Sequence, residues 1–429
     1  MKHFIKEVVV KLLTFEAKIV LRRTKPKIIA ITGSVGKTST KDAIFIALKE
    51  KYSVRKSEKS FNTEIGVPLT VLGLSNAWSS PVGWLKNLIE GAALAIYPAN
   101  YPEILVLEMG VDHPGDMQKH CEWIKPDTVV LTRLPDLPVH VEFFDSPEAV
   151  IAEKLILVSA LKDNGVLVYN SDDEKVSKVA SEQRQKSIGY SRYSKSDFRI
   201  TGDKVLYDGD KLKGISFDIA NSSNLATFEV KDTLGIQHAY SIAAAAAVAE
   251  EYDVSLKEVA TLMQGYHPPA ARMRLVEGIK NTLIIDDTYN SSPTALERAL
   301  LTLGEIETNG RKIAVLGDML ELGQYATKAH EEVGELVAKN ADFLVTIGVR
   351  ARKIAEGALE NGMSEKNILQ YDSVDKAANE VQNILEEGDI VLVKASQSIR
   401  AEKFVEEIMA EPERAEELLT RQSPEWKNK

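Results

Sequence analysis

The chain has 429 residues, of which 44% are hydrophobic and 27% charged, a balance typical of a soluble globular protein. The length predicts two or three domains, and the apolar content excludes a chain that is disordered throughout. The single cysteine, Cys121, excludes a disulfide framework and favours a reducing compartment, so we expect a cytoplasmic protein. No apolar run reaches the roughly 18 uncharged residues of a membrane span, and no signal-peptide pattern is visible. The formal net charge of −10 argues against a nucleic-acid partner.

The first 27 residues carry charge of the opposite sign. They hold eight Lys and Arg against two Glu, a balance of +6, which leaves −16 for the rest of the chain. Apolar residues recur at helical spacing over 3–23, and Pro26 follows, which predicts one amphipathic helix. We expect this helix to pack on the central sheet, and its packing face would consist of Phe4, Val8, Leu12 and Ile19. The alternative is transient attachment of residues 1–24 to an anionic membrane surface.

From residue 27 onward, short apolar strands alternate with helical stretches. This alternation is typical of a parallel sheet that is covered by helices. The predicted strands are 27–32, 104–108, 128–132 and 165–169. Residues 195–232 instead contain short β-like pieces with Gly-Asp and Asn-Ser turns, which predict an antiparallel patch, and an Ala-rich helix follows at about 240–251.

A turn-rich segment at 265–269 marks the clearest domain boundary. Beyond it a second alternating series begins, with strands near 283–287, 312–316, 343–347 and 390–393. We therefore predict an α/β protein with a central domain built on a mostly parallel sheet, followed by a Rossmann-like C-terminal α/β domain. The predicted divisions are an N-terminal helix (1–24), the central domain (25–268), the C-terminal domain (269–410) and a charged tail (411–429). We expect the tail to fray.

The strongest chemical motif is the run Thr-Gly-Ser-Val-Gly-Lys-Thr-Ser at 32–39, between an apolar strand and a helical pattern. This is the context of a phosphate loop, where glycines let backbone N–H groups face phosphate oxygens at a helix N-terminus. The usual pattern has four residues between the glycines, and this loop has two. Lys37 would neutralise the β- and γ-phosphates, and Thr38 would bind Mg²⁺. The central domain is therefore predicted to be a P-loop ATPase domain. The predicted nucleotide contacts are Gly33, Ser34, Val35, Gly36, Lys37, Thr38 and Ser39; the alternative is a Gly-rich turn with an exposed lysine.

Glu108 ends the predicted strand 104–108 at the carboxyl edge of the sheet. Beside the strand that carries the phosphate loop, a carboxylate at this edge lies where the metal of a nucleotide binds. Taken alone, such a residue is equally well a helix cap or a surface acid. The phosphate loop favours the metal ligand.

Several segments together resemble motifs of the Mur ligases, a family that forms amide bonds in the assembly of cell-wall peptides. They are 31–38, 62–68, 107–110 with 112–115, 286–293 and 316–323. The last two look most like the branch that adds D-alanyl-D-alanine to the UDP-muramoyl-tripeptide. The similarity runs from about residue 27 to 403. Members of the family normally carry a separate N-terminal domain for the UDP-sugar, and in this chain only the helix of 3–23 precedes the phosphate loop.

The resemblance implies a second metal site, which in the family is completed by a histidine and a carbamylated lysine. His140 and Lys154 occupy the matching spacing. A carbamate turns a cationic amine into an anionic oxygen ligand, and a neutral imidazole binds divalent ions well. Without the resemblance, Lys154 would be interpreted as a solvated helix residue and His140 as a loop residue.

The resemblance also implies nucleotide and substrate contacts. Arg272 is similar to a linker arginine that reaches the ATP phosphates, although Ala271 stands where the family usually has Gly. Asp287 resembles an acid that helps to bind nucleotide and orient the C-terminal domain, and His238 lies in the segment near the adenine, where the usual asparagine is replaced. The segment 394–400 resembles a family Lys-Gly-Ser-Arg motif with two substitutions. Expected substrate contacts are Asn62, Thr63 and His113 for the acid, and Asn290 and Ser292 for the amine.

These features imply an ATP-dependent amide ligase with two Mg²⁺ sites and an acyl-phosphate intermediate, acting as a monomer on small-molecule and peptide substrates. A substrate carboxylate would attack the γ-phosphate, and an amine would then displace phosphate. Two alternatives stay open. One is a Mur-like ligase for a different acid and amine, such as a folate-type or polymer peptide ligase, and the other is a P-loop NTPase without ligase activity.

Overall fold

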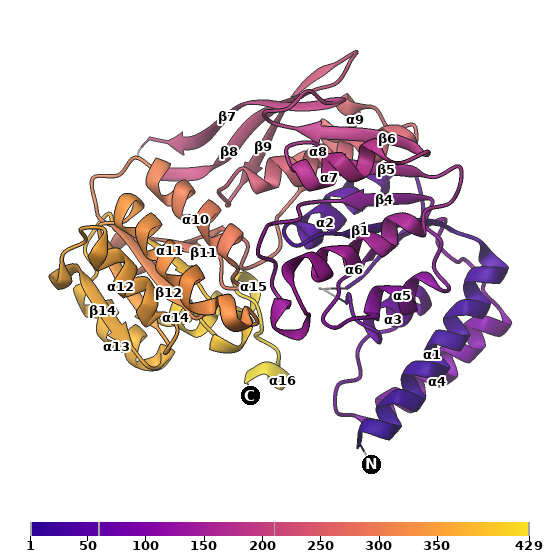
Figure 1. Cartoon of the computed structure of the whole chain (residues 1–429), viewed down its shortest axis with the longest axis horizontal. Coiled ribbons are helices and arrows are strands. Elements are labelled where there is room, and N and C mark those ends of the chain that lie inside the picture. Colours follow the sequence, from indigo (N-terminus) through magenta and orange to yellow (C-terminus); the bar gives the residue numbers. More distant parts are fainter. Residues whose placement is uncertain (1, 59–60, 210, 428–429) are drawn as a thin grey trace.

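The computed structural model describes residues 2–58, 61–209 and 211–427, and two β-sheets form its framework (Figure 1). The larger sheet has the strand order β2-β3-β1-β4-β5-β6-β7-β8-β9. Its strands are β1 (Lys27–Thr32), β2 (Val54–Lys56), β3 (Ile104–Glu108), β4 (Thr128–Leu131), β5 (Val166–Asn170), β6 (Lys186–Ser191), β7 (Phe198–Asp208), β8 (Lys211–Ala220) and β9 (Leu225–Lys231). Pairing is parallel from β2 to β7 and antiparallel from β7 to β9. The predicted parallel sheet and antiparallel patch are therefore confirmed.

Helices cover both faces of the parallel part of this sheet. They are α1 (Lys2–Thr24), α2 (Lys37–Leu48), α3 (Gly66–Leu72), α4 (Pro81–Ile96), α5 (Asp116–Cys121), α6 (Pro147–Ser159), α7 (Glu174–Ser181), α8 (Gln237–Glu251) and α9 (Leu256–Leu262). Along β1, Ile29 and Ile31 join the core formed with α2 and α8, whereas Ile28 and Ala30 join the core formed with α1, α3, α5 and α6. This alternation follows from the two-residue period of a strand whose two faces are both buried.

The extent predicted for α1 is confirmed. Of its predicted packing face, Ile19 is half-buried and packs against the core, as expected, whereas Val8 and Leu12 do not. The side chains that α1 buries are Leu13, Ala17 and Val20. Val8 and Leu12 are exposed, and the side chain of Phe4 lies outside the described residues. The buried face contacts α3 and α4, because α1 lies beside these helices at the margin of the molecule (Figure 1).

The C-terminal domain is a six-stranded sheet with the order β10-β11-β15-β12-β13-β14. Its strands are β10 (Arg274–Glu277), β11 (Leu283–Asp286), β12 (Lys312–Gly317), β13 (Phe343–Ile347), β14 (Ile368–Tyr371) and β15 (Ile390–Lys394). Its helices are α10 (Pro293–Glu305), α11 (Ala326–Asn340), α12 (Arg352–Glu360), α13 (Val374–Ile384), α14 (Glu402–Ile408), α15 (Ala415–Leu418) and α16 (Pro424–Lys427). All pairings except β10–β11 are parallel, so the predicted second α/β unit is confirmed.

The charged tail was expected to fray, but its described part, residues 411–427, packs on the C-terminal domain. Arg421 is buried, and its guanidinium donates to Glu402 Oε2 at 3.0 Å and to the carbonyl of Thr288 at 3.2 Å. A third hydrogen bond reaches the carbonyl of Tyr289. Arg421 therefore attaches the tail to the C-terminal domain. Of the helices within the described ranges, none is both long and apolar enough to cross a membrane.

Candidate active site

The phosphate loop lies between β1 and α2, at the carboxyl end of the parallel sheet. Gly33 has a φ of 134°, and a Cβ there would lie 2.0 Å from Thr132 Oγ1 on the neighbouring segment. Gly36 has a φ of 87° and stands at the start of α2. Both conformations favour glycine, and they bring the backbone of the loop close to β4. Because β1 lies between β3 and β4, the loop opens at the crevice where the direction of the strand order changes.

Lys37 lies at the centre of this crevice. Its Nζ donates to the carbonyl of Gly33 at 2.9 Å, so the side chain folds back over its own loop. Burial lowers the pKa of Lys37, while the nearby carboxylates of Glu108 and Asp112 raise it and Arg272 lowers it. The loop lysine, two acids and the linker arginine therefore share one electrostatic environment.

Glu108 ends β3 beside the loop, as predicted, and only 2% of its side chain is exposed. Its Oε1 lies 3.4 Å from Asn62 Nδ2, and its Oε2 lies 3.9 Å from Lys41 Nζ. Among the described residues, Oε2 has no hydrogen-bond partner. A buried carboxylate oxygen without a donor is costly, and a divalent cation would satisfy it.

Lys154 projects from α6 into the same region. Its side chain is buried, and within the described part of the chain it has no hydrogen-bond or ion-pair partner. Burial and the positive charge of Lys37 together lower the pKa of Lys154 to about 7, although the carboxylates of Asp112 and Glu153 oppose this shift. At neutral pH, much of this side chain is therefore an uncharged amine.

His140 connects the two domains. It has a φ of 71° and precedes a short 3₁₀ turn, η1 (Val141–Phe143). Its Nδ1 lies 2.8 Å from Glu321 Oε2 in the C-terminal domain, and its Nε2 lies 3.6 Å from Asp112 Oδ1. The contact with His140 holds the pKa of Glu321 below its usual range. Glu321 lies in a segment that the family resemblance covers, but its pairing across the domains was not predicted.

The linker that follows residues 265–269 carries Arg272. Its guanidinium lies over the ring of Tyr289, 4.0 Å from the ring centroid. Ala271 has a φ of 58°, which is the left-handed conformation that glycine adopts without strain. Ala271 thus adopts the backbone conformation that the glycine usual in the family would adopt.

Asp287 fixes this linker to the C-terminal sheet. Its Oδ1 accepts from the backbone N–H of Met273 at 3.2 Å, and its Oδ2 accepts from Lys394 Nζ at 2.6 Å. Both carboxylate oxygens therefore have partners within the chain. These contacts agree with the expectation that Asp287 orients the C-terminal domain.

His238 does not face an open site, although a contact with adenine was expected. The side chain is completely buried, and its Nε2 lies 3.0 Å from Thr233 Oγ1 and 3.2 Å from the carbonyl of Arg272. Burial lowers the pKa of His238 to about 4, so the ring is neutral at pH 7. The neighbouring Gln237 is the residue that lines a pocket. His238 therefore contacts the backbone of the linker that carries Arg272 and helps to position it.

The five expected substrate residues fall into two groups. Asn62 reaches Glu108, and the exposed ring of His113 lies 4.8 Å from the ring of Phe143 in η1, so these two border the crevice. The carbonyl of Thr63 accepts from the backbone at the start of α3. In the C-terminal domain, Ser292 Oγ caps α10, and Asn290 Oδ1 accepts from the next backbone N–H.

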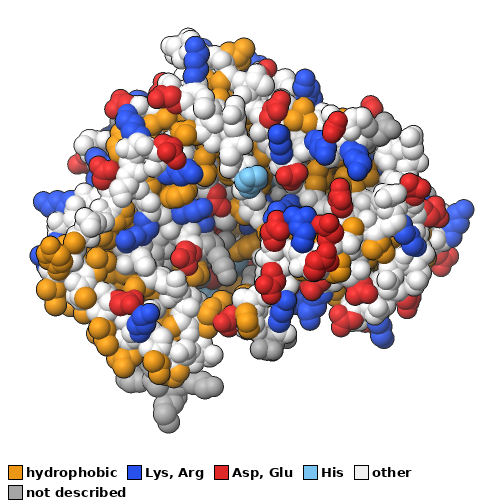
Figure 2. Space-filling view, turned by 180° about the vertical axis from the view of Figure 1, so that it is seen from behind, with side chains coloured by type: hydrophobic (Ala, Val, Ile, Leu, Met, Phe, Trp, Pro, Cys, Tyr) orange, Lys and Arg blue, Asp and Glu red, His pale blue; other side chains and the backbone are white. Residues whose placement is uncertain are grey.

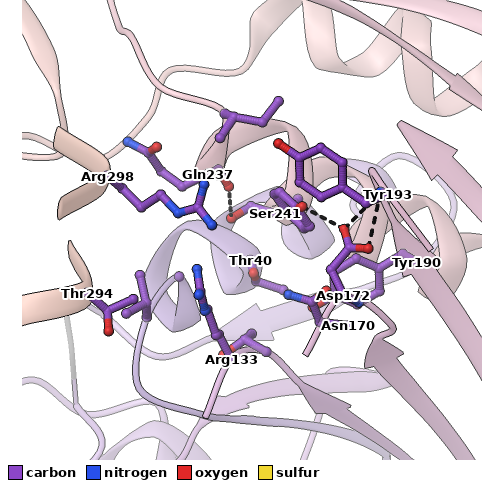
Figure 3. A pocket seen from close by; sticks show the side chains of 15 residues that line it. Thr40, Arg133, Asn170, Asp172, Tyr190, Tyr193, Gln237, Ser241, Thr294 and Arg298 are labelled. Carbon is purple, nitrogen blue, oxygen red and sulfur yellow. Dashed lines mark hydrogen bonds between the residues drawn. The ribbon is translucent and has the colours of Figure 1, made fainter. Parts of the chain in front are cut away.

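A pocket opens beside the phosphate loop, between the two domains (Figure 3). Gly36 and Thr40 form its inner wall, Arg133 and Asp172 come from the central domain, and Arg298 comes from α10. Asp172 accepts from Tyr240 Oη at 2.7 Å and from three successive backbone N–H groups, and these bonds hold its pKa below the usual range despite burial. Tyr193 and Tyr240 supply aromatic surface, so the pocket suits a planar, polar group attached to a phosphate chain.

Comparisons with known proteins agree with this geometry. The model of the Mur ligase middle domain matches residues 31–249, and that of the Mur ligase, glutamate ligase domain matches residues 271–397. The UDP-N-acetylmuramoyl-tripeptide–D-alanyl-D-alanine ligase of Bacillus subtilis is 30% identical over 398 residues, which are 92% of this chain and 79% of that protein. The ligase of the same name from Mycobacterium tuberculosis strain H37Rv is 29% identical over 390 residues, 86% of this chain and 70% of that protein.

Solved structures show the same likeness. The MurF ligase of Thermotoga maritima in complex with ADP superposes with a TM-score of 0.76 at 27% identity, covering 93% of this chain and 83% of that one. A MurF structure from Acinetobacter baumannii also has a TM-score of 0.76, with 19% identity and coverage of 92% and 79%, which shows a shared fold.

Proposed function

Since the chain belongs to the Mur ligase family, we propose that it is the ATP-dependent, ADP-forming ligase that adds D-alanyl-D-alanine to a UDP-muramoyl-tripeptide. The observation that carries this proposal is the match to the Bacillus subtilis ligase along 92% of the chain. The crevice supports it, because Lys37, Glu108 and Arg272 meet there between the two domains.

The proposed reaction has two steps. An oxygen of the substrate carboxylate attacks the γ-phosphorus in line, the bond between that phosphorus and the bridging oxygen breaks, and ADP leaves. The amine nitrogen then attacks the acyl carbon, the bond to phosphate breaks, and the amine releases a proton. Lys37 offsets negative charge on the transferring group, and Arg272 neutralises the phosphates from the linker. Both are electrostatic roles that depend on position.

We propose two Mg²⁺ sites in the crevice, where the bound ions would neutralise the phosphates and draw the carboxylate toward them. Thr38 and Glu108 would hold the nucleotide metal, and Glu108, His140 and carbamylated Lys154 the second. The unsatisfied Oε2 of Glu108 supports this assignment. The uncharged amine of Lys154 is the form that reacts with CO₂, and its low pKa supports the carbamate. Because Glu321 faces Nδ1 of His140, Nε2 is left to bind metal.

The pocket of Figure 3 is the proposed site of the adenosine part of ATP. Gly33 to Ser39 would hold the phosphates, Tyr193 and Tyr240 would border the base, and Arg133 and Arg298 would approach it from the two domains. His238 and Asp287 would act by positioning the linker and the C-terminal domain.

The substrate assignments follow from the two sides of the crevice. Asn62, Thr63 and His113 border the central domain and would contact the acid. Asn290 and Ser292 lie at the start of α10, where the amine would enter. We also propose that the chain acts as a monomer in the cytoplasm, a location supported by the lone, buried thiol of Cys121.

The test is ADP release combined with mass spectrometry of the products, using ATP, Mg²⁺, UDP-muramoyl-tripeptide and D-alanyl-D-alanine. We expect ADP to form over many turnovers only when both the acid and the amine are present, because the acid alone allows a single acyl phosphate per active site. The ligated product should have the summed mass of the acid and the amine less water. Lys37→Ala should lower kcat by at least 100-fold. Lys49→Ala, at the exposed end of the same helix, is the matched control and should keep the parental rate.

Two outcomes would overturn the proposal. ADP release over many turnovers without the amine would indicate an NTPase. Release without ligated product from this acid, but with product from a folate-type or polymeric acid, would assign the alternative substrate class.

A further inference from the structure

The helix α4 carries an apolar stripe on its outer face. Val82, Leu85, Ile89 and Ile96 are 78%, 60%, 62% and 73% exposed, and Tyr97, directly after the helix, is 77% exposed. Their spacing of three, four and seven residues places them on one side of the helix. The opposite side buries Asn87, Gly91 and Ala95 against the molecule. The stripe is therefore the outward face of a helix that is otherwise packed.

The helix α1 lies directly beside α4. Arg23 Nη1 donates to the carbonyls of Ala95 and Ile96 at 2.7 Å, and Glu16 lies against Gly91. Because Gly91 and Ala95 are small, the two backbones approach closely. α1 adds exposed apolar side chains of its own, namely Val8, Leu12 and Phe15.

Exposed large hydrophobic side chains are concentrated on this pair of helices. Of the sixteen such side chains among the described residues, nine lie on α1, on α4 or in the segments next to α4. Figure 2 shows hydrophobic side chains gathered along the lower left margin, where the pair lies when the molecule is seen from behind. The other seven are scattered over both domains. Single exposed hydrophobic residues are ordinary, whereas a contiguous patch of this kind marks an interaction site.

The charge around the patch is positive, although the whole chain is acidic. Between Lys6 and Lys25, α1 and its end carry six Lys and Arg against two Glu. Lys11, Arg22 and Arg23 are exposed there. On α4, the charges are Lys86 and Glu90, which lie 3.7 Å apart and balance each other. An apolar stripe beside a cationic helix matches the surface of a membrane that contains anionic lipid.

We propose that the α1–α4 pair docks this protein on an anionic lipid surface. The stripe of α4 enters the boundary between headgroups and acyl chains, and the cations of α1 lie over the headgroups. With 16 residues, α4 is shorter than the roughly 20 residues needed to span a bilayer, so it lies in the surface.

A second copy of the chain is a poorer occupant of this surface. The seven scattered hydrophobic side chains form no second apolar patch within the described residues, so a copy could offer only the same helix pair. That contact would bring two cationic α1 helices together, and like charges disfavour it. An anionic lipid surface removes this repulsion.

The test is co-sedimentation of the full chain with phosphatidylcholine vesicles that contain 30% phosphatidylglycerol, compared with pure phosphatidylcholine. We expect binding to the anionic vesicles, reduced by salt. Leu85→Ser/Ile89→Ser should lower the partition coefficient at least tenfold, because both side chains lie in the middle of the stripe. Leu225→Ser/Val349→Ser is the matched control, since these residues are 61% and 71% exposed on other elements, and it should bind like the parent.

A charge variant tests the other half of the proposal. Lys11→Gln/Arg22→Gln should weaken binding to anionic vesicles roughly tenfold and leave binding to neutral vesicles unchanged. Thermal unfolding and ATP turnover without lipid serve as readouts of folding, and none of these substitutions should change them.

Equal pelleting of the parent and the stripe variant would overturn the proposal, and so would no pelleting of the parent. A dimer in sedimentation velocity that the stripe variant abolishes, without vesicle binding, would assign the patch to a second copy instead.

Discussion

At the scale of single residues, Lys154 shows how burial prepares a side chain for chemistry. Most buried lysines have a carboxylate partner, whereas the described surroundings of Lys154 include no ion pair and place Lys37 nearby. The protonated amine of Lys154 therefore destabilises the folded chain. The neutral amine that results is the reactive form, so the position that destabilises the cation also favours carbamate formation.

This cost predicts a pH dependence of stability in buffer free of CO₂. The pKa of Lys154 is about 7 in the folded chain and about 10.4 in the unfolded chain. The unfolded chain thus binds more protons between pH 7 and pH 10, and the contribution of Lys154 to stability rises with pH across that window. Lys154→Met removes this contribution. The stability advantage of the variant over the parent should therefore shrink by about 3 kcal/mol from pH 7 to pH 10.

Urea unfolding at several pH values measures this difference, because any change in packing adds the same offset at every pH. Lys328→Met, at an exposed position of α11, is the control and should show a difference that does not vary with pH. A constant difference for Lys154→Met as well would mean that the amine stays charged in the folded state.

At the scale of elements, the C-terminal tail acts as a clamp on the C-terminal domain. Glu402, at the start of α14, is completely buried, and its two oxygens contact Arg400 and Arg421. Arg421 also holds the carbonyls of Thr288 and Tyr289, which follow β11. The tail thus connects α14 to the loop that leads toward the crevice.

Removal of this arginine should destabilise the domain. Arg421→Ala leaves the buried carboxylate of Glu402 with one cation and leaves two carbonyls without donors. We expect a loss of about 3–5 kcal/mol of unfolding free energy in urea. Arg414→Ala, which breaks exposed pairs with Glu411 and Glu417 in the same tail, should cost less than about 1 kcal/mol. Similar losses for the two variants would contradict the clamp.

The elements also show where sequence reasoning succeeds and where it does not. The run 32–39 could be predicted because strand, glycines, lysine and helix follow one another directly in the chain. The packing face of α1 could not, since its sequence contains two apolar stripes, one with Val8 and Leu12 and one with Leu13 and Ala17. Only the position of α3 and α4 decides which stripe is covered.

At the scale of the whole molecule, residues of both domains line the pocket that we propose for the adenosine of ATP. Asp172 follows β5, Tyr240 lies on α8 and Arg298 lies on α10, and these elements meet only in the folded chain. No local pattern connects them, and for this reason the sequence did not predict them. The polar run after β5 was the one available signal, because it lies at the carboxyl edge of a parallel sheet.

This arrangement predicts that ATP affinity depends on the C-terminal domain. Arg298→Ala should weaken ATP binding roughly 5- to 20-fold, as expected for the loss of one charged contact, although the phosphate loop is untouched. Isothermal titration calorimetry measures the dissociation constant. Arg352→Ala, which removes an exposed arginine of α12 in the same domain, should change it less than twofold. An unchanged constant for Arg298→Ala would mean that the central domain binds ATP alone.

The position of β15 has a consequence for the order of events during synthesis. This strand pairs with β11 on one side and β12 on the other, yet it leaves the ribosome after all other strands of its sheet. Until residues 390–394 emerge, β11 and β12 each lack a neighbour, and such open strand edges pair readily with other chains. The C-terminal domain therefore completes its sheet only after all its other described strands have been translated, and a nascent chain is most exposed to misassembly just before β15 appears.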